Sequence, residues 1–344
     1  MRERIIMSVT TQETSRFTIG IGNRYDSLYL RNGTIKVEGF DVEFPAPPGR
    51  EQAQSVRQKP GDQAYVAPSS MFTAMATNPI YDIGELALST YFQAVDFGKE
   101  ITALPVFPSR FFPHSQISVN VNAGICVPLD LVGKRVCIGS FSKNYAVWLR
   151  GILRHQYDVA VERIIWVEDQ PEHFSEYRAP DRYIVEKLPA EQRPSASLET
   201  GVIQALVAPR GPQRNQSPLV RALFENPYAE IRSYVESNPF FPINTVITVP
   251  KATLKKSPEF LRAVFTAFQR ALKLYQKEVN TGSRDDEHSG LALKRLEAEA
   301  RVTLPDYGLR QNRDNIRAMI QHCYEQGVIR RLYTLEELFL LPDS

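Results

Sequence analysis

The middle of the chain alternates short apolar segments with amphipathic ones, and this alternation narrows the possible folds most. "DLVGKRVCIGS" (130–140) predicts a turn and a strand, and "SFSKNYAVWLRGILRHQY" (140–157) predicts a helix. "RIIWVED" (163–169) is a second strand, and "SLETGVIQALVAPR" (197–210) changes from helix to strand around Gly201. Such β-α-β alternation favours an α/β fold with a mostly parallel sheet and helices on both faces.

The two ends of the chain complete a two-lobed arrangement. At 344 residues the chain suits two domains of ordinary size. Its last third reads as helical, for example "SPEFLRAVFTAFQRALKLYQKEV" (257–279), with Ser257 at the N-cap. We expect residues 1–120 and 241–344 to form one lobe, with the C-terminal helices, and residues 121–240 to form an inserted α/β lobe. Ligands would bind in the cleft between the lobes.

Composition excludes several classes of function. The net charge of +2 gives no basic surface for nucleic acid or an acidic membrane. No apolar run approaches the roughly 20 residues of a membrane span, and "IIM" near the N-terminus is too short for a signal peptide. We therefore expect a cytoplasmic protein with a small-molecule partner. The sequence leaves the oligomeric state open, a homo-oligomer included.

Cysteine and histidine spacing predicts neither a disulfide framework nor a metal site. The three cysteines lack CxxC spacing, and the five histidines show no HxxxH or HxH pairs. A divalent metal held by residues far apart in the sequence is not excluded. No phosphate-binding glycine loop of the dinucleotide type is present, so no cofactor is predicted.

The strongest candidate for an anion site follows the strand that ends at Gly139. A helix begins within a few residues, and its free N–H groups and positive end favour an anion. Ser140, Ser142 and Lys143 add side-chain donors. The alternative interpretation is an ordinary surface helix capped by one of the two serines.

Two arginines are candidates for binding a carboxylate. Arginine holds a carboxylate through two parallel hydrogen bonds, which lysine cannot do. Arg110 lies in the aromatic stretch "FPSRFFPHS" (107–115), and Arg150 lies beside Trp148 on a predicted helix. Each could instead form a salt bridge on the surface or between the lobes.

Three further residues are candidates for acid–base chemistry. His114 titrates near neutral pH and could donate a proton, or it could be a hydrogen-bonded structural histidine. Glu85 lies in an apolar stretch and is either a buried acid with a raised pKa or a helix residue that faces solvent. Asp26 comes just after the first strand, where a cleft would open.

Several stretches together resemble the 4,5-dihydroxyphthalate decarboxylase family. They are spread in the expected order over nearly the whole chain: "YDIGELALSTY" (81–91), "LPVFPSRFFPHSQISVN" (104–120), "DLVGKRVCIGS" (130–140), "AVWLRGIL" (146–153) and "YEQGVIRRLYTLEELF" (324–339). The resemblance implies the two-lobed fold of type-2 periplasmic binding proteins, adapted to catalysis. It also implies loss of CO₂ from a hydroxylated aromatic or related cyclic carboxylic acid.

The resemblance also suggests roles for the candidate residues. Arg110, Arg150 and the helix end at Ser140, Ser142 and Lys143 would hold carboxylates. His114 would protonate the ring carbon, and Glu85 or Asp26 would orient the ring hydroxyl or the histidine. Trp148 would pack against the substrate ring. Asn244 and Thr245 would contact the substrate where the chain returns to the first lobe.

The chain departs from the family pattern at two places. Ser27 follows the Tyr-Asp pair where the family has arginine, and Asn244-Thr245 follows Phe-Pro-Ile where the family has Met-His. These changes indicate a diverged member with a different aromatic or cyclic acid as substrate. The alternatives are a non-catalytic solute-binding protein and a lyase of the same fold with different chemistry.

Overall fold

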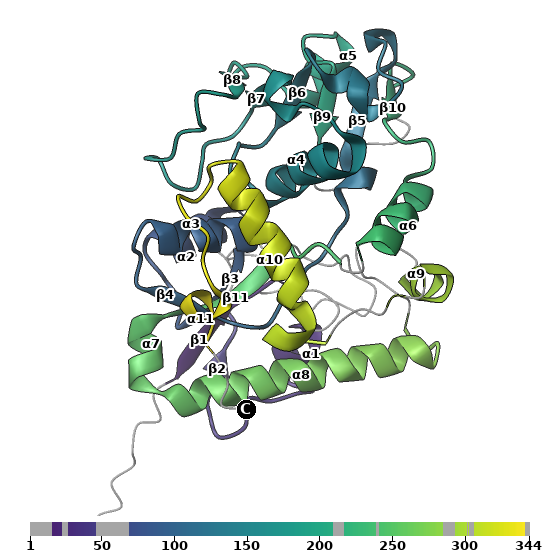
Figure 1. The fold of residues 1–344 in the computed structure, drawn as a ribbon. Coiled ribbons are helices and arrows are strands. Elements are labelled where there is room, and N and C mark those ends of the chain that lie inside the picture. The colour runs from purple at the N-terminus through teal and green to yellow at the C-terminus, as the bar shows by residue number, and fades with distance from the viewer. Residues whose placement is uncertain are drawn as a thin grey trace, which may run out of the picture.

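Two α/β lobes lie one above the other, joined by packed helices and strands (Figure 1). The computed structural model describes residues 16–22, 27–45, 69–208, 217–238, 241–284, 293–300, 302 and 306–340. Within these ranges no helix combines the length and the apolar character needed to span a bilayer.

The first lobe is built on a mixed sheet in the order β2-β1-β3-β11-β4. Strand β1 (Phe17–Gly20) is parallel to β2 (Val42–Glu43) and β3 (Ile83–Ala87). Strand β11 (Thr245–Pro250) runs antiparallel between β3 and β4 (Ile101–Leu104). The chain therefore returns to this lobe late in the sequence and inserts one strand between two early ones.

The second lobe has the mostly parallel sheet that the alternating pattern predicts. Its order is β10-β5-β9-β6-β7-β8. Strands β9 (Ala205–Val207), β6 (Arg135–Ile138), β7 (Ile165–Glu168) and β8 (Ile184–Lys187) are parallel to one another. Strand β5 (Ile117–Asn120) is antiparallel to β9 and to β10 (Val220–Ala222).

Strand β5 corrects the sequence-based lobe boundary at residue 120. Ile117 is paired with Val207, so residues 117–120 belong to the second sheet although we assigned them to the first lobe. The apolar alternation of this segment identifies a strand but not the sheet that it joins, because sheet membership depends on partners about 90 residues away.

Helices cover both sheets. Those of the first lobe are α1 (Ser27–Arg31), α2 (Ser69–Thr77), α3 (Leu88–Asp96), α7 (Lys251–Lys256) and α8 (Pro258–Asn280). Those of the second are α4 (Asn144–Tyr157), α5 (Pro194–Glu199) and α6 (Pro227–Ser237). The C-terminal helices are α9 (Leu293–Ala300), α10 (Leu309–Glu325) and α11 (Leu335–Leu338), the last with a capping box formed by Thr334 and Glu337.

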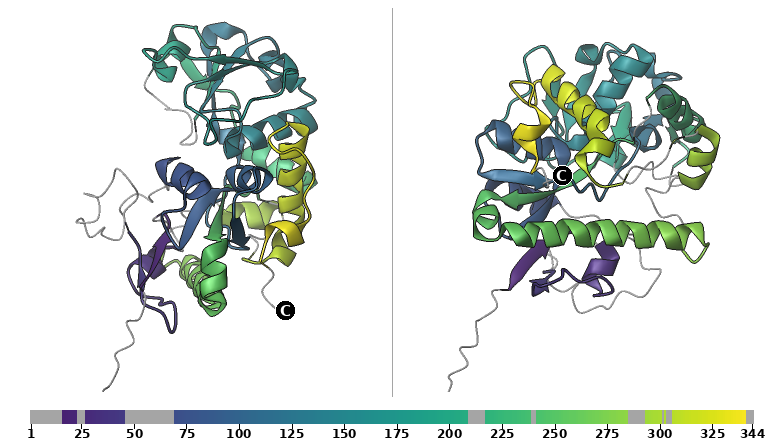
Figure 2. Two further views of the ribbon diagram at one scale, coloured as in Figure 1. Left: turned by 90° about the vertical axis from the view of Figure 1, so that its left-hand side faces the viewer. Right: turned by 60° about the horizontal axis from the view of Figure 1, so that its bottom comes forward.

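Helix α10 links the lobes. It packs against α3 of the first lobe and α4 of the second, and both views in Figure 2 show it alongside each. Just beyond its end, the Gln326 side chain donates to the Val147 carbonyl on α4 at 2.9 Å. The two lobes therefore share a helical layer on one side.

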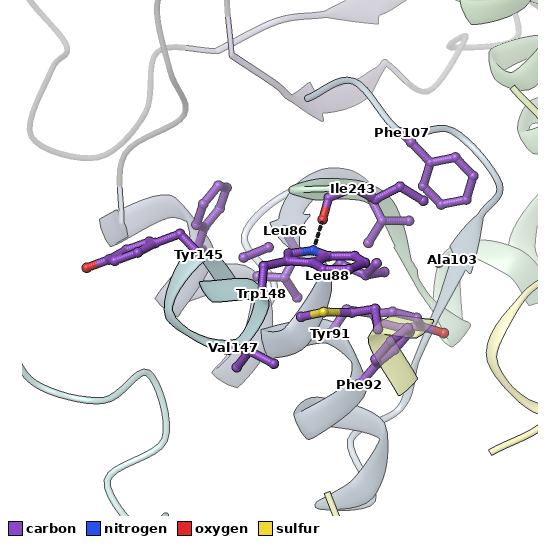
Figure 3. Close-up of a cluster of buried hydrophobic side chains, with 14 of the residues drawn as sticks. Leu86, Leu88, Tyr91, Phe92, Ala103, Phe107, Tyr145, Val147, Trp148 and Ile243 are labelled. Carbon is purple, nitrogen blue, oxygen red and sulfur yellow. Dashed lines mark hydrogen bonds between the residues drawn. The ribbon is translucent and has the colours of Figure 1, made fainter. Parts of the chain in front are cut away.

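The hydrophobic core continues from one lobe into the other around Trp148. The Trp148 side chain is fully buried, and its indole N–H donates to the Ile243 carbonyl at 2.8 Å. Figure 3 shows the ring among Leu88, Tyr91 and Ile243. Trp148 thus fixes helix α4 to the segment that leads into β11.

Candidate functional site

The carboxyl ends of β6 and β7 form a polar edge of the second sheet. Residues 139–145 and 169–174 follow these strands, and we call the two segments together the β6–β7 edge. They are held side by side, because the Asp169 N–H donates to the Ile138 carbonyl at 3.2 Å and the Gln170 N–H to the Gly139 carbonyl at 2.8 Å. In open α/β sheets ligands bind at such carboxyl ends.

A pocket of about 280 Å³ opens at this edge. Gly139, Tyr145, Asp169 and Gln170 line one side of it, and residues of β5, α5, β9 and the start of β10 line the rest. Every lining residue belongs to the second lobe. The volume is at the small end of the range for small-molecule sites.

Lys143 and Tyr145 both lie against Gly139; Gly139 and Tyr145 line the pocket, whereas Lys143 is not among its lining residues. A Cβ on Gly139 would lie 2.5 Å from the Tyr145 hydroxyl and 3.1 Å from the Lys143 Nζ, so a larger residue there would displace both side-chain ends. The Gly139 N–H donates to the Tyr145 hydroxyl oxygen at 2.6 Å, which leaves the tyrosine proton for another acceptor. The Lys143 ammonium donates to the Gln170 side chain.

Burial and nearby charges shift the pKa values of Lys143 and Asp169 in opposite directions. Burial lowers the pKa of Lys143, and the Asp169, Glu172 and Glu168 carboxylates partly oppose this shift. Burial raises the pKa of Asp169, and the Lys143 ammonium partly opposes it. A cation and an acid with perturbed pKa values beside a pocket are suited to bind an anion and to move a proton.

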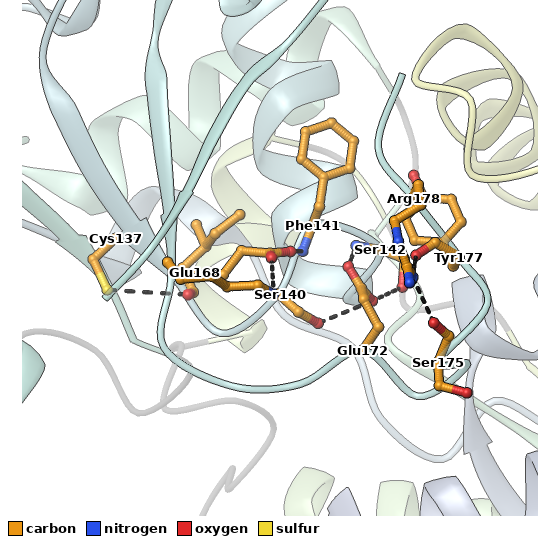
Figure 4. Close-up of polar contacts among 11 residues, drawn as sticks. Cys137, Ser140, Phe141, Ser142, Glu168, Glu172, Ser175, Tyr177 and Arg178 are labelled. Carbon is orange, nitrogen blue, oxygen red and sulfur yellow. Dashed lines mark hydrogen bonds and ion pairs between the residues drawn. The ribbon is translucent and has the colours of Figure 1, made fainter. Parts of the chain in front are cut away.

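The donors of the predicted anion site bind a carboxylate of the chain itself. Ser140 Oγ donates to Glu172 Oε2 at 3.1 Å, the Ser142 N–H donates to Glu172 Oε1 at 3.0 Å, and the Ser142 hydroxyl also donates to Glu172 (Figure 4). The Phe141 N–H donates to Glu168 at 2.6 Å. Burial raises the pKa of Glu172. Direct substrate contacts by Ser140 and Ser142 stay a prediction that requires Glu172 to move.

The capping prediction for this helix is wrong. The N-cap position of α4 is Lys143, and no side chain caps the helix there. The two serine hydroxyls that could have capped it donate to Glu172 instead.

Arg110 and Arg150 make interior contacts, and neither is among the residues that line the pocket. Arg110 donates to the Phe241 carbonyl at 3.0 Å and to Asn312 Oδ1 at 2.5 Å. Arg150 donates to Gln326 Oε1 at 2.7 Å, and its guanidinium lies 3.7 Å from the centre of the Phe141 ring. Arg150 Nη1 is buried with no hydrogen-bond partner among the described residues. Carboxylate binding by either arginine stays a prediction.

His114 lies in an aromatic cage that we define by Phe112, Tyr157, Phe224 and Tyr234, whose ring centres are 5.5–6.4 Å from its own. His114 Nε2 lies 3.1 Å from Gln156 Oε1. Burial lowers the pKa of His114 to about 4, so the imidazole is neutral at pH 7. His114 does not line the pocket, and its role as proton donor stays a prediction.

Glu85, Asn244 and Thr245 are not among the residues that line the pocket. Glu85 is the buried acid that one reading of the sequence predicted, and it accepts the Gly22 N–H at 2.9 Å at the end of β1. Asn244 contacts Ser109 and Asn144 where the chain re-enters the first lobe, and Thr245 beside it is fully buried. Asp26 lies outside the described residues.

Four residues of the β6–β7 edge were not among the sequence candidates: Tyr145, Asp169, Glu172 and His173. His173 connects the edge to the first lobe, because its Nδ1 lies 2.8 Å from the Thr73 hydroxyl on α2. Burial lowers the pKa of His173 to about 4. The signal was the polar run "EDQPEH" directly after a predicted strand, which has the same position relative to β7 as the Gly-Ser segment has to β6.

Solved structures define the class of fold. The chain superimposes on the aliphatic sulphonate binding protein SsuA of Escherichia coli with a TM-score of 0.51 and 16% identity, over 95% of this chain and 92% of the other. It superimposes on the alkanesulfonate-binding SsuA of Xanthomonas axonopodis pv. citri with a TM-score of 0.51 and 14% identity, over 94% and 98%. The protein therefore has the two-lobed α/β fold of periplasmic binding proteins.

Curated sequences narrow this class. No protein-family profile matches the chain. It is 26% identical over 336 residues to a 4,5-dihydroxyphthalate decarboxylase of Comamonas testosteroni. This alignment covers 94% of this chain and 96% of that protein. It is 27% identical over 234 residues to the protein of that name from Pseudomonas putida, in an alignment that covers 66% of this chain and 81% of that protein. The chain is a diverged relative of the 4,5-dihydroxyphthalate decarboxylases.

Proposed function

We propose that the protein is a non-oxidative decarboxylase that acts on a hydroxylated aromatic or related cyclic carboxylic acid. Both curated relatives described above carry the name of a carboxy-lyase. The observation that carries the proposal in the structure is that Asp169 lines the pocket while Lys143, which attracts it electrostatically, lies against the lining residue Gly139. This pair offers a cation for a substrate carboxylate and an acid for the ring.

The chemistry requires a proton at the carbon that loses the carboxylate. A hydroxyl group para to the carboxylate supplies electron density to that carbon. In the proposed reaction protonated Asp169 donates its proton to the ring carbon that bears the carboxylate. The carbon–carbon bond to the carboxylate then breaks and CO₂ leaves. The electron pair of the broken bond stays with the ring and restores its aromaticity. Asp169 then regains a proton from solvent. The raised pKa of Asp169 supports this role, because it increases the fraction of the acid that still holds its proton.

The neighbours of Asp169 would position the substrate. Lys143 would bind the carboxylate until the bond breaks, and its partly buried position would strengthen that attraction. The Tyr145 hydroxyl, which accepts from Gly139, would donate its proton to a substrate oxygen. This reaction needs no organic cofactor.

The experiment is a turnover assay in D₂O. The purified protein is incubated with 4,5-dihydroxyphthalate and with a series of mono- and dihydroxybenzoates, and CO₂ release is measured. We expect one of these acids to release CO₂ and to carry one deuterium at the vacated carbon. The Asp169→Asn variant should release CO₂ at a much lower rate. Saturable binding of an aromatic acid without CO₂ release from any of them would overturn the proposal.

The fold itself favours a second candidate function, a non-catalytic binding protein for a small carboxylate. The two superimposed structures above are sulfonate-binding proteins. A binding protein would hold the same acid through Lys143 without consuming it, so turnover separates the two functions. Cell fractionation tests the cytoplasmic location that we expect for the enzyme.

A further inference from the structure

A second polar cluster lies at the opposite end of helix α4 from the pocket. His155 is near the carboxyl end of α4, and His322 and Glu325 are in the last turn of α10. One potential ligand atom from each of the three lies within 4.8 Å of the other two. His155 Nε2 already lies 2.9 Å from Glu325 Oε2, and the two imidazole rings stack with their centres 5.4 Å apart.

Packing against α4 fixes the position of His322. A Cβ on Gly151 would lie 2.7 Å from three atoms of the His322 ring, so the glycine makes room for this imidazole. The ring also meets Trp148 edge-on, with centres 5.3 Å apart. His322 is only 8% exposed, and among the described residues no hydrogen-bond partner reaches its Nδ1.

A buried polar atom without a hydrogen-bond partner is rare in folded proteins. Packing holds the His322 ring in place, and its Nδ1, which has no partner among the described residues, is available to coordinate an ion.

We propose that His155, His322 and Glu325 form a binding site for a divalent transition-metal ion of the zinc class. Two imidazoles and one carboxylate suit zinc, whereas magnesium and calcium prefer oxygen ligands alone. Around a tetrahedral ion with bonds of about 2.0–2.2 Å, ligand atoms are about 3.3 Å apart. Rotation of the His155 side chain, which is 51% exposed, and of Glu325, which is 25% exposed, can close the present spacing.

The proposed ion would join the two helices rather than take part in the reaction. The eleven residue steps from Asn144 to His155 span about 16.5 Å of helix, which separates the cluster from the pocket. Because α10 also packs on the first lobe, an ion between α4 and α10 would fix the helical layer that the lobes share. The exposed side of His155 gives the ion access from solvent, and a water would complete its coordination.

The test measures metal binding directly, without any assay of activity. Tag-free protein is treated with a chelator, dialysed and titrated calorimetrically with Zn²⁺. We expect one equivalent to bind, and His155→Ala and Glu325→Gln each to weaken the affinity at least tenfold, since each removes one of three ligands. Glu336→Gln is the matched control, because Glu336 is an exposed glutamate on α11, and it should bind as the unaltered protein does.

A second readout uses Co²⁺ in place of zinc. The unaltered protein should show the visible absorption of a tetrahedral cobalt centre, and the double variant His155→Ala/Glu325→Gln should not. His155 is exposed and Glu325 is partly exposed, so the variants should fold. Absence of saturable Zn²⁺ binding, or equal affinity in the double variant and the unaltered protein, would overturn the proposal. Neither result depends on whether the protein is a decarboxylase.

Discussion

His114 and Lys143 are both enclosed polar side chains of the second lobe, but their surroundings differ in kind. Aromatic rings surround His114, and its hydrogen-bond partner is the uncharged Gln156. Lys143 is near the three carboxylates of Glu168, Asp169 and Glu172 and beside the pocket wall. The aromatic cage favours a neutral group, whereas the carboxylates favour a cation.

This difference shows that burial alone does not indicate function. A titratable group can be buried because it completes a packed core, as the contacts of His114 allow. It can also be buried near opposite charges that stabilise its charged form close to a pocket, as at Lys143. We therefore place the proposed chemistry at the β6–β7 edge, and the variants below test whether that choice is right.

The largest effect is expected at Asp169. Asp169→Asn keeps the shape of the side chain but removes the acid, so kcat should fall by about 10²–10⁴-fold, the usual contribution of a general acid. Steady-state kinetics on the best substrate measures the change. Glu199→Gln is the matched control, because Glu199 is another carboxylate that lines the pocket. An unchanged kcat in Asp169→Asn would remove Asp169 from the mechanism.

The next effect is a loss of stability at His114. His114→Ala empties the aromatic cage and should reduce the free energy of unfolding by about 2–4 kcal/mol, as large-to-small core substitutions do. At a temperature where the variant is folded, kcat should remain within a few-fold of the original. Chemical denaturation and kinetics give the two quantities. A hundredfold fall in kcat with unchanged stability would instead make His114 the proton donor, the role that the family resemblance suggests.

The aromatic cage also predicts how stability depends on pH. The folded-state pKa of His114 is lowered from 6.5 to about 4, so the unfolded chain binds the additional proton below pH 6.5. Stability from this group is therefore complete above pH 6.5 and is lost as the pH falls toward 4, by about 2 kcal/mol at pH 5. Urea denaturation at pH 7 and pH 5 should show this loss in the unaltered protein and a smaller one in His114→Gln. Equal losses in the two proteins would mean that His114 keeps its ordinary pKa.

The sequence predicted the fold well because the fold depends on local patterns. The alternation of strands and helices around residues 130–208 was sufficient to expect a mostly parallel sheet. The assignment of β5 failed because the identity of a neighbouring strand is not a local property.

The site was predicted only in part, for the same reason. The Gly-Ser segment after β6 indicated donors for an anion, and in the structure these donors bind Glu172, some 30 residues further along the chain. The partners of Arg110 and Arg150, Asn312 and Gln326, are on or next to α10. Spacing within a segment shows which donors are available, but only the tertiary fold shows which acceptor each donor meets.

A smaller effect is expected at Lys143. Lys143→Met keeps most of the length of the side chain and removes the charge, so KM for the carboxylic acid should rise about tenfold, which corresponds to about 1.4 kcal/mol of lost binding. Lys134→Met is the matched control, since the Lys134 ammonium donates to the Ala123 carbonyl, whereas Lys143 lies against the pocket residue Gly139. If KM is the same in both variants, Lys143 does not bind the substrate.

The smallest effect tests whether the β6–β7 edge accepts an anion from outside the chain. Glu172→Ala removes the internal carboxylate and frees the Ser142 N–H and the two serine hydroxyls. Because these donors lie at the start of α4, sulfate should then bind there and raise the Tm of the variant by a few degrees more than that of the unaltered protein. At ten times its Kd, sulfate would add about 1.4 kcal/mol of stability.

Glu176→Ala is the control for this last variant, because it removes a nearby exposed carboxylate that does not contact the helix end. A similar sulfate response in Glu172→Ala, Glu176→Ala and the unaltered protein would show that the serines hold no external anion. Lys143 would then be the sole cationic or donor group of the predicted helix-end site still available to a substrate carboxylate. A response specific to Glu172→Ala would instead mean that Glu172 occupies a position that a substrate carboxylate can take, so the edge would have two places for an anion while the aromatic cage around His114 has none.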